Sequence, residues 1–205
     1  MGPTRGDLVM RRSYSEQASF TTRAFREIVW PEIGAMCGGG NLVSLEGPSS
    51  DLDTRGGIDA YQVFRTGVRT IAQRTQRVDE YDKPSTFTIR VDRADGGITE
   101  WEKRVDALDR NNDLPTITVQ AYVMEQKAYM VKAGIVHTRP FYQWARQNRH
   151  HFHRKEARDD GNGFLIIPWL LLMLDSNVPF AVKDLFAQVR SPKGHFIDWP
   201  KDRWI

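Results

Sequence analysis

The chain has 205 residues, a formal net charge of +3 and a single cysteine, Cys37. That length is enough for one domain, spanning 1–205, that buries a sizeable core without covalent cross-links. One cysteine excludes an intrachain disulfide and a thiolate metal cage, and it fits a reducing compartment. The longest apolar run, 164–174, is too short to span a bilayer, and no apolar leader follows Met1. We therefore expect a soluble, cytoplasmic protein with no membrane partner.

Many of the 29 basic residues are arginines. A guanidinium group suits bidentate phosphate contacts better than an ammonium group does. The composition therefore permits a nucleic-acid partner. Arginines scattered over a solvated surface explain the same composition equally well.

The first predicted element is an amphipathic helix over 15–30. A capping-box pattern lies at 13–16, and apolar residues recur at helical spacing over 20–29. Pro31 is expected to kink or end this helix.

A hairpin is predicted next, after the glycine run 38–40 and a short strand over 41–45. Its arms are 57–64 and 68–76, which are rich in β-branched and aromatic residues, with Thr66-Gly67 as the turn.

The register of this hairpin decides which polar side chains meet. If Thr66-Gly67 are the two loop residues, Asp59 faces Arg74 across the ladder and Gln76 lies one diagonal step away. A loop one residue longer aims Gln73 and Thr75 at Asp59 instead.

The remaining elements follow from alternation, capping boxes and apolar periodicity. We expect a strand over 86–91, a helix over 99–108 with a capping box from Thr99 to Glu102, a strand over 116–123, a helix from 138, a polar loop over 147–162, a buried run over 164–174, and a last helix over 180–189.

The predicted elements are a helix, a hairpin with Gly57-Ile58-Asp59 on one arm and a polar triplet on the other, and then a strand, a helix and a strand. This order of elements resembles the PD-(D/E)XK nuclease superfamily. The resemblance covers 13–123. It implies a restriction-endonuclease-like α/β fold, a mixed central sheet flanked by helices, here followed by a C-terminal helical extension over 124–205.

In that superfamily the acid of the first arm binds Mg²⁺, and Asp59 matches it. The second arm supplies an acid or Gln, a spacer and a Lys; the candidates here are Gln73-Arg74 and Arg74-Thr75-Gln76, and neither is the standard triplet. An acid on the first helix sometimes completes the metal site, and Glu27 matches it.

The function implied is a nuclease that hydrolyses DNA with Mg²⁺ or Mn²⁺. A metal polarises the phosphoryl oxygen and activates water, while a cation meets the charge that develops on the phosphate. Asp59 and Glu27 are the expected metal ligands, Gln73 or Gln76 orients water or phosphate, and Arg74 stabilises charge but cannot act as a base.

Two alternatives remain open at this stage. Asp59 and Arg74 can form an ordinary cross-strand ion pair, and Glu27 can pair with Arg23 on the surface. The chain is then a nuclease-like fold without catalysis that binds nucleic acid, a second copy of itself or another protein. The residues expected to contact nucleic acid are Arg69, Arg74, Arg149, Arg154 and Lys155.

Overall fold

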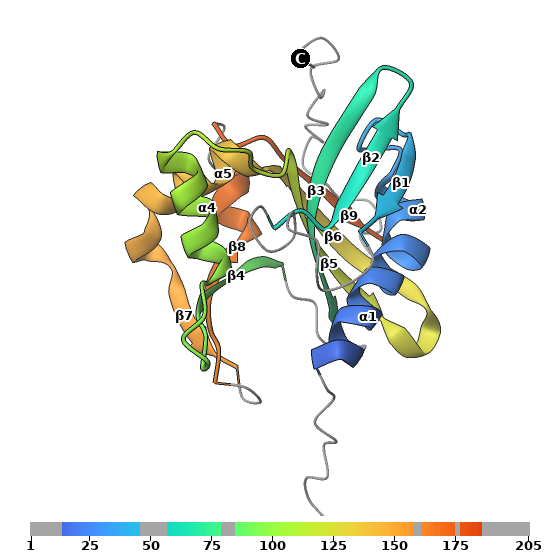
Figure 1. The fold of residues 1–205 in the computed structure, drawn as a ribbon. Coiled ribbons are helices and arrows are strands. Elements are labelled where there is room, and N and C mark those ends of the chain that lie inside the picture. Colours follow the sequence, from blue (N-terminus) through green and yellow to red (C-terminus); the bar gives the residue numbers. More distant parts are fainter. Residues whose placement is uncertain (1–13, 46–56, 79–84, 158–160, 175–176, 186–205) are drawn as a thin grey trace, which may run out of the picture.

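The computed structural model describes residues 14–45, 57–78, 85–157, 161–174 and 177–185, with side chains from Ser19 onward. It is a mixed α/β structure with a six-stranded sheet in the order β1-β2-β3-β5-β6-β9 and a three-stranded sheet in the order β4-β8-β7 (Figure 1). No helix in this part of the chain combines the length and apolar character needed to cross a bilayer.

The strands of the larger sheet are β1 (Asn41–Ser44), β2 (Ala60–Phe64), β3 (Gly67–Arg77), β5 (Ile117–Met124), β6 (Tyr129–His137) and β9 (Phe180–Asp184). Those of the smaller sheet are β4 (Thr86–Asp92), β7 (His153–Glu156) and β8 (Gly163–Pro168). The helices are α1 (Tyr14–Ala24), α2 (Trp30–Ile33), α4 (Glu100–Asp109), α5 (Thr138–Gln147) and α6 (Trp169–Leu174), with a π-helical segment η1 (Phe25–Val29) and 3₁₀ turns η2 (Glu125–Lys127) and η3 (Arg149–His151).

The first helix is confirmed, and it continues past the predicted end. α1 runs through η1 into α2, so the chain stays helical to Ile33. Pro31 lacks an N–H and cannot close the ordinary bond to the preceding turn, and the π-helical segment ends at Val29, two residues before it. The capping box at 13–16 falls outside the described side chains.

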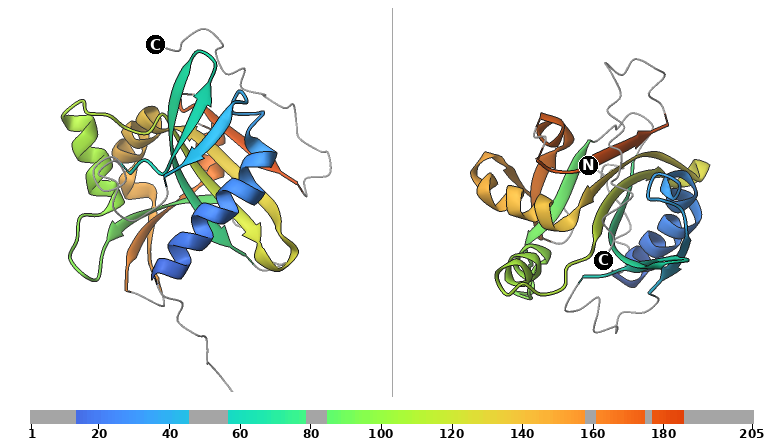
Figure 2. Two further views of the ribbon diagram at one scale, coloured as in Figure 1. Left: turned by 45° about the vertical axis from the view of Figure 1, so that its right-hand side comes forward. Right: turned by 90° about the horizontal axis from the view of Figure 1, so that it is seen from above.

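The larger sheet is covered on both faces, as Figure 2 shows from above. Along β5 the odd-numbered residues from Ile117 to Val123 join the core beneath the first helix, whereas Tyr122 and Met124 join the core on the other face. All eight residues of β5 are buried, because helices or strands lie against each side.

The second face is covered by the smaller sheet with α4, α5 and α6 (Figure 1). The core between this layer and the larger sheet is aromatic. The centre of the Phe87 ring lies 5.0 Å from that of Phe141 and 5.9 Å from that of Trp169. Trp169 packs so closely on β6 that a Cβ at Gly134 would lie 2.7 Å from its ring.

Most of the predicted elements are confirmed. β1, both arms of the hairpin, β4, β5 and α5 lie where the sequence patterns put them. α4 begins with the expected capping box: the Thr99 side chain accepts from the Glu102 N–H, and the Glu102 carboxylate accepts from the Thr99 N–H.

Three expectations for the C-terminal third are wrong. The polar loop over 147–162 contains η3 and β7, and 180–184 form β9 rather than the start of a helix. The part after 123 is not a helical extension, because β6 and β9 complete the larger sheet and β7 and β8 build the smaller one. Short amphipathic stretches fit either a strand or a helix, and here pairing with β6 decides for β9.

The predicted hairpin register is also wrong. Phe64 pairs with Gly67 and Ala60 with Ile71, so the loop residues are Arg65 and Thr66, and Gly67 already belongs to β3. β2 therefore stops at the level of Ile71, while β3 continues to Arg77 and pairs there with β5. Beyond Ile71 no described strand pairs with the other edge of β3, which we call the open edge.

Candidate functional site

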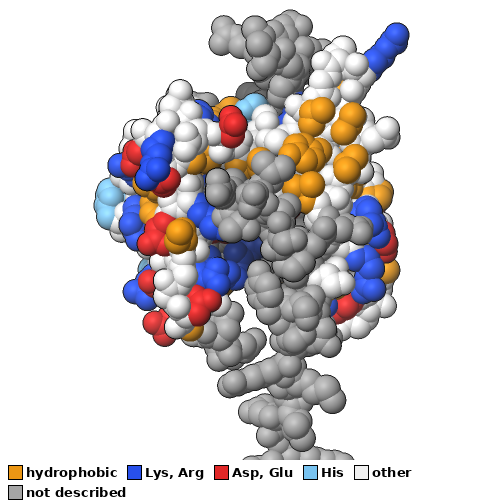
Figure 3. All heavy atoms as spheres, viewed as in Figure 1, with side chains coloured by type: hydrophobic (Ala, Val, Ile, Leu, Met, Phe, Trp, Pro, Cys, Tyr) orange, Lys and Arg blue, Asp and Glu red, His pale blue; other side chains and the backbone are white. Residues whose placement is uncertain are grey.

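A cavity of about 900 Å³ lies around the open edge of β3. Because no described strand covers this edge, side chains from both faces of β3 line the same space. The other walls come from α1, β4, α4, β5 and α5 and from the segment before β2. In Figure 3 Lys and Arg side chains gather in the hollow at the centre of the view.

The described lining of this cavity is strongly basic. Seven cationic side chains and two carboxylates contribute to it: Arg23, Arg26, Arg74, Arg90, Arg93, Lys103 and Arg104, with Asp59 and Glu100. A concave surface with this imbalance concentrates anions. The lining therefore suits a phosphate-bearing ligand.

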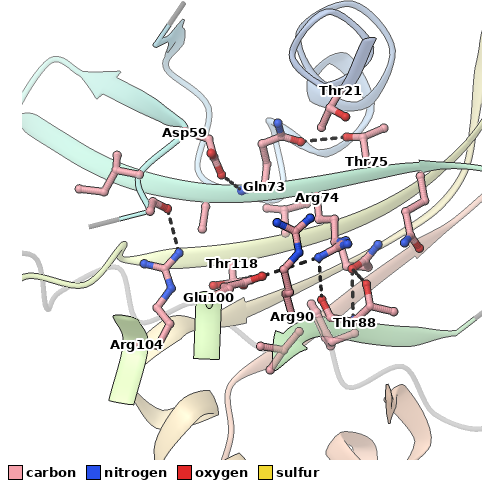
Figure 4. Close-up of a pocket in the computed structure, with 18 of the residues that line it drawn as sticks. Thr21, Asp59, Gln73, Arg74, Thr75, Thr88, Arg90, Glu100, Arg104 and Thr118 are labelled. Atoms are coloured by element: carbon pink, nitrogen blue, oxygen red, sulfur yellow. Dashed lines mark hydrogen bonds and ion pairs between the residues drawn. The ribbon is translucent and has the colours of Figure 1, made fainter. Parts of the chain in front are cut away.

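One half of the cavity lies on the α1 side of β3 and contains Asp59 (Figure 4). Asp59 Oδ2 accepts a hydrogen bond of 2.6 Å from the Gln73 N–H, and Thr75 Oγ1 donates to Gln73 Oε1 at 3.0 Å. Thr21 of α1 lies above them. The Asp59 carboxylate and the Gln73 side-chain amide are thus oriented on one side of the open edge. We call this part of the cavity the acidic half.

Arg104 holds the segment that carries Asp59. Its Nη2 donates to the Gly57 carbonyl at 2.8 Å, and Gly57 has a φ of +57°. A Cβ at Gly57 would lie 2.6 Å from Arg104 Nη2, so this approach requires glycine. The Gly57-Ile58-Asp59 motif therefore owes its first residue to packing against α4.

The other half of the cavity lies on the opposite side of β3 and contains Arg74 (Figure 4). The Arg74 guanidinium lies 3.7 Å from Glu100 Oε2 and 4.5 Å from the centre of the Phe164 ring. Desolvation lowers the pKa of Arg74, Glu100 opposes this, and the neighbouring Arg90 lowers that pKa further. Arginine keeps its charge near neutral pH despite such shifts. We call this the basic half.

Glu100 is fixed from two sides. Tyr142 donates its hydroxyl to Glu100 Oε1 at 2.8 Å, while Arg74 lies beside Oε2. Burial, with Glu100 next, raises the pKa of Tyr142 well above its ordinary value, so its hydroxyl stays protonated. Tyr142 therefore acts as a donor that orients the carboxylate.

Four predicted site residues line the cavity, but they divide between its halves. Asp59 and Gln73 belong to the acidic half, and Arg74 and Gln76 point to the other face of β3. The expected opposition of Asp59 and Arg74 is wrong, because the two-residue loop lies one residue earlier, at Arg65-Thr66, and pairing with β2 ends at Ile71, before Arg74. Glu27 does not line the cavity; it is exposed and pairs with Arg26 at 2.9 Å rather than with Arg23.

The other residues expected to contact nucleic acid also lie outside the cavity. Arg69 is 5% exposed and donates to the Cys37 carbonyl at 2.9 Å. Arg149 lies over the Trp101 ring, Arg154 pairs with Asp92, and Lys155 is exposed on β7. Cys37 itself is buried, which raises its pKa to about 12 and fits a structural thiol.

Several lining residues were not singled out from the sequence. Arg104 occupies the buried stripe of α4, three residues after Trp101, and Gln120 is a long polar side chain in β5, all of whose residues are buried. A long polar side chain on a buried stripe costs free energy unless it has a partner. That cost is the signal that could have identified both residues.

The described residues offer few metal ligands. Among them there is no cluster of three or more His, Cys, Asp or Glu side chains that could hold an ion. Mg²⁺ is often held by one or two carboxylates, with water and substrate phosphates as the other ligands. Comparison with protein families, with curated proteins and with solved structures gives no match for this chain.

Proposed function

We propose that the protein is a metal-dependent nuclease of the restriction-endonuclease-like type, which hydrolyses phosphodiester bonds in DNA at the acidic half of the cavity. The observation that carries the proposal is the pairing of Asp59 with Gln73 at the open edge of β3, inside a cavity rich in arginine. The topology supports it as well: a helix, three antiparallel strands, then β4 of the smaller sheet, a helix, and β5 parallel to β3.

The donor atoms of the acidic half fit Mg²⁺ or Mn²⁺. Asp59 offers a carboxylate and Gln73 an amide oxygen, and hard divalent cations prefer oxygen ligands. The hydrogen bond from the Gln73 N–H restricts the carboxylate, and the Thr75 hydroxyl fixes the amide. When bound, such an ion polarises the phosphate and lowers the pKa of a water molecule.

The chain's own residues bind and orient the substrate. Arg23 of α1 and Arg26 of η1 line the cavity on the acidic half and meet phosphate charge there, in the role that the superfamily gives to the lysine of the second arm. Arg74, on the basic half, binds a neighbouring phosphate. Arginines meet the phosphate before and during the reaction, so their loss lowers both affinity and rate.

The test is cleavage of DNA by Asp59→Asn. The substitution keeps the shape and removes the charge that holds the metal. We expect a loss of at least about a hundredfold in rate, because a metal ion supplies several kcal/mol to this reaction. DNA binding measured in EDTA should survive or rise, since a negative charge leaves the phosphate site.

The matched control is Asp106→Asn, which removes an exposed carboxylate of α4 that pairs with Arg110 outside the cavity. It should cleave like the parent. Full activity of Asp59→Asn at saturating Mg²⁺ would show that the metal site lies elsewhere.

A second candidate is a nuclease-like module that binds nucleic acid without cutting it. The observation that favours it is that Asp59 is the one carboxylate among the described residues lining the acidic half. The same assays separate the two functions. A parent protein that binds DNA but leaves DNA and RNA intact in both Mg²⁺ and Mn²⁺ is the binding module.

A further inference from the structure

The basic half of the cavity contains a buried amide donor with no partner among the described residues. Gln120 of β5 is 1% exposed and lines the cavity, and its Nε2 makes no hydrogen bond within the described part of the chain. Its orientation is fixed, because Gln120 Oε1 accepts from the Thr88 N–H at 3.3 Å and from the Thr88 hydroxyl at 3.1 Å. A buried donor without an acceptor costs about 1–3 kcal/mol unless a ligand supplies one.

A second donor on this half, from β4, also lacks an acceptor among the residues that the structure describes. Arg90 Nε is buried and makes no hydrogen bond to them. The guanidinium of Arg90 lies 5.7 Å from the centre of the Phe164 ring, and that of Arg74 lies 4.5 Å from the same ring. Two guanidinium groups beside one ring repel each other, and an anion between them relieves that repulsion.

The charge and number of donors define the class of ligand. Glu100 is the carboxylate on this half, and the cations are Arg74, Arg90 and Arg104, which reaches it beside the Tyr142 ring while its Nη2 donates to Gly57. Three cations against one carboxylate leave an excess that matches a dianion better than the single charge of a phosphodiester. Two guanidinium groups and an amide also offer more donors than the two oxygens of a carboxylate can accept.

We infer that the basic half is a binding site for a phosphate monoester, held by Arg74 of β3, Arg90 of β4 and Gln120 of β5. This site is separate from Asp59 and needs no metal. Two sources carry the same group: the 5′-phosphate end of a nucleic-acid strand and a free nucleotide. The nucleic-acid source rests on the proposed function, whereas binding of inorganic phosphate does not.

The experiment is calorimetric titration in EDTA, where cleavage cannot proceed. The ligands are a short oligodeoxynucleotide with a 5′-phosphate, the same oligonucleotide with a 5′-hydroxyl, a nucleoside 5′-monophosphate, and inorganic phosphate as competitor. We expect the 5′-phosphate to tighten binding about tenfold or more, because hydrogen bonds between charged groups are strong. Equal affinity of the mononucleotide and the phosphorylated oligonucleotide identifies a free nucleotide as the ligand and equally supports the site.

Two variants test the residues. Arg90→Gln removes a cation, and Gln120→Glu keeps the oxygen that accepts from Thr88 while replacing the amide donor by a negative charge. Each should abolish the preference for the 5′-phosphate. Thermal unfolding checks that each variant is folded. If Arg90→Gln does not fold, Gln120→Glu, which preserves the contacts to Thr88, still tests the site.

The controls separate this site from the nuclease proposal. Arg154→Gln removes a cation outside the cavity, and Asp59→Asn alters the acidic half; both should keep the preference for the 5′-phosphate. A parent that binds both oligonucleotides equally and ignores inorganic phosphate would refute the site. So would variants at Arg90 and Gln120 that discriminate like the parent, whatever the outcome of the cleavage assay.

Discussion

At the scale of single residues, His137 links stability to pH. It ends β6, where burial, with a smaller effect from Arg69, lowers the pKa of its imidazole below 6.5. Between the two pKa values the unfolded chain therefore binds a proton at His137 that the folded protein does not bind. The contribution of His137 to the free energy of unfolding is fully present above pH 6.5 and is lost as the pH falls toward the lower pKa of the folded state.

We expect His137→Gln to weaken the loss of stability between pH 7.5 and pH 5.5. Urea denaturation midpoints at both values measure this loss. His150, exposed on η3, provides the control His150→Gln. Equal acid destabilisation of the parent and both variants would mean that other groups govern this range.

Asp59, Gln73, Arg74 and Gln76, the catalytic residues predicted from the sequence, all line the cavity, and their roles stay predictions. Prediction from the sequence failed for the pairing of Asp59 with Arg74, whereas the alternative that placed Gln73 and Thr75 near Asp59 gives the observed neighbours, although the loop is shifted by one residue rather than longer. A two-residue loop can sit at Arg65-Thr66 or at Thr66-Gly67, and nothing local distinguishes the two strongly. Only the pairing of Phe64 with Gly67 decides which side chain stands beside Asp59.

At the scale of elements, the contact of Trp169 with β6 permits a direct test. A methyl group at Gly134 would lie 2.7 Å from the ring of Trp169, which is itself buried. We expect Gly134→Ala to destabilise the fold by about 1–3 kcal/mol, the usual cost of overpacking. In thermal unfolding this corresponds to a fall in Tm of several degrees.

Gly67→Ala is the matched control. Gly67 also lies in a strand, and a Cβ there would meet no atom within 4 Å. The Tm of the Gly67→Ala variant should stay close to that of the parent. Similar losses in both variants would show that strand propensity, not contact with Trp169, sets the cost at Gly134.

Elements with local signals were the predictable ones. α4 carries its capping box in four residues, and β4 alternates clearly. β6 was not predicted, because seven of its nine residues are buried, so no alternation marks it, and the turn residues that precede β5 at 111–115 have no counterpart before it. Such strands depend on neighbours that are distant in the sequence.

At the scale of the whole molecule, the basic lining predicts a steep salt dependence of DNA binding. Each phosphate contact releases condensed counterions, so affinity falls with the logarithm of the salt concentration. With several of the lining cations engaged, Kd should rise about a hundredfold or more between 50 and 200 mM salt. Fluorescence anisotropy with labelled DNA in EDTA measures this change.

The location of the contacts is tested by paired variants. Arg23→Gln and Lys103→Gln alter the lining, and each should weaken binding and flatten the salt dependence. Arg154→Gln and Lys155→Gln remove cations of β7 and should change little. The reverse pattern would place the DNA on the smaller sheet.

The way the smaller sheet is assembled also bears on how the protein is made. β4 pairs with β8, which follows α4, β5, β6 and α5 in the chain. During synthesis on the ribosome, β4, with Phe87 and Ile89, therefore remains without its partner strand until most of the chain has emerged. Pairings between distant segments are slow to form. The nascent chain should accordingly depend on chaperones until Gly163–Pro168 has left the exit tunnel.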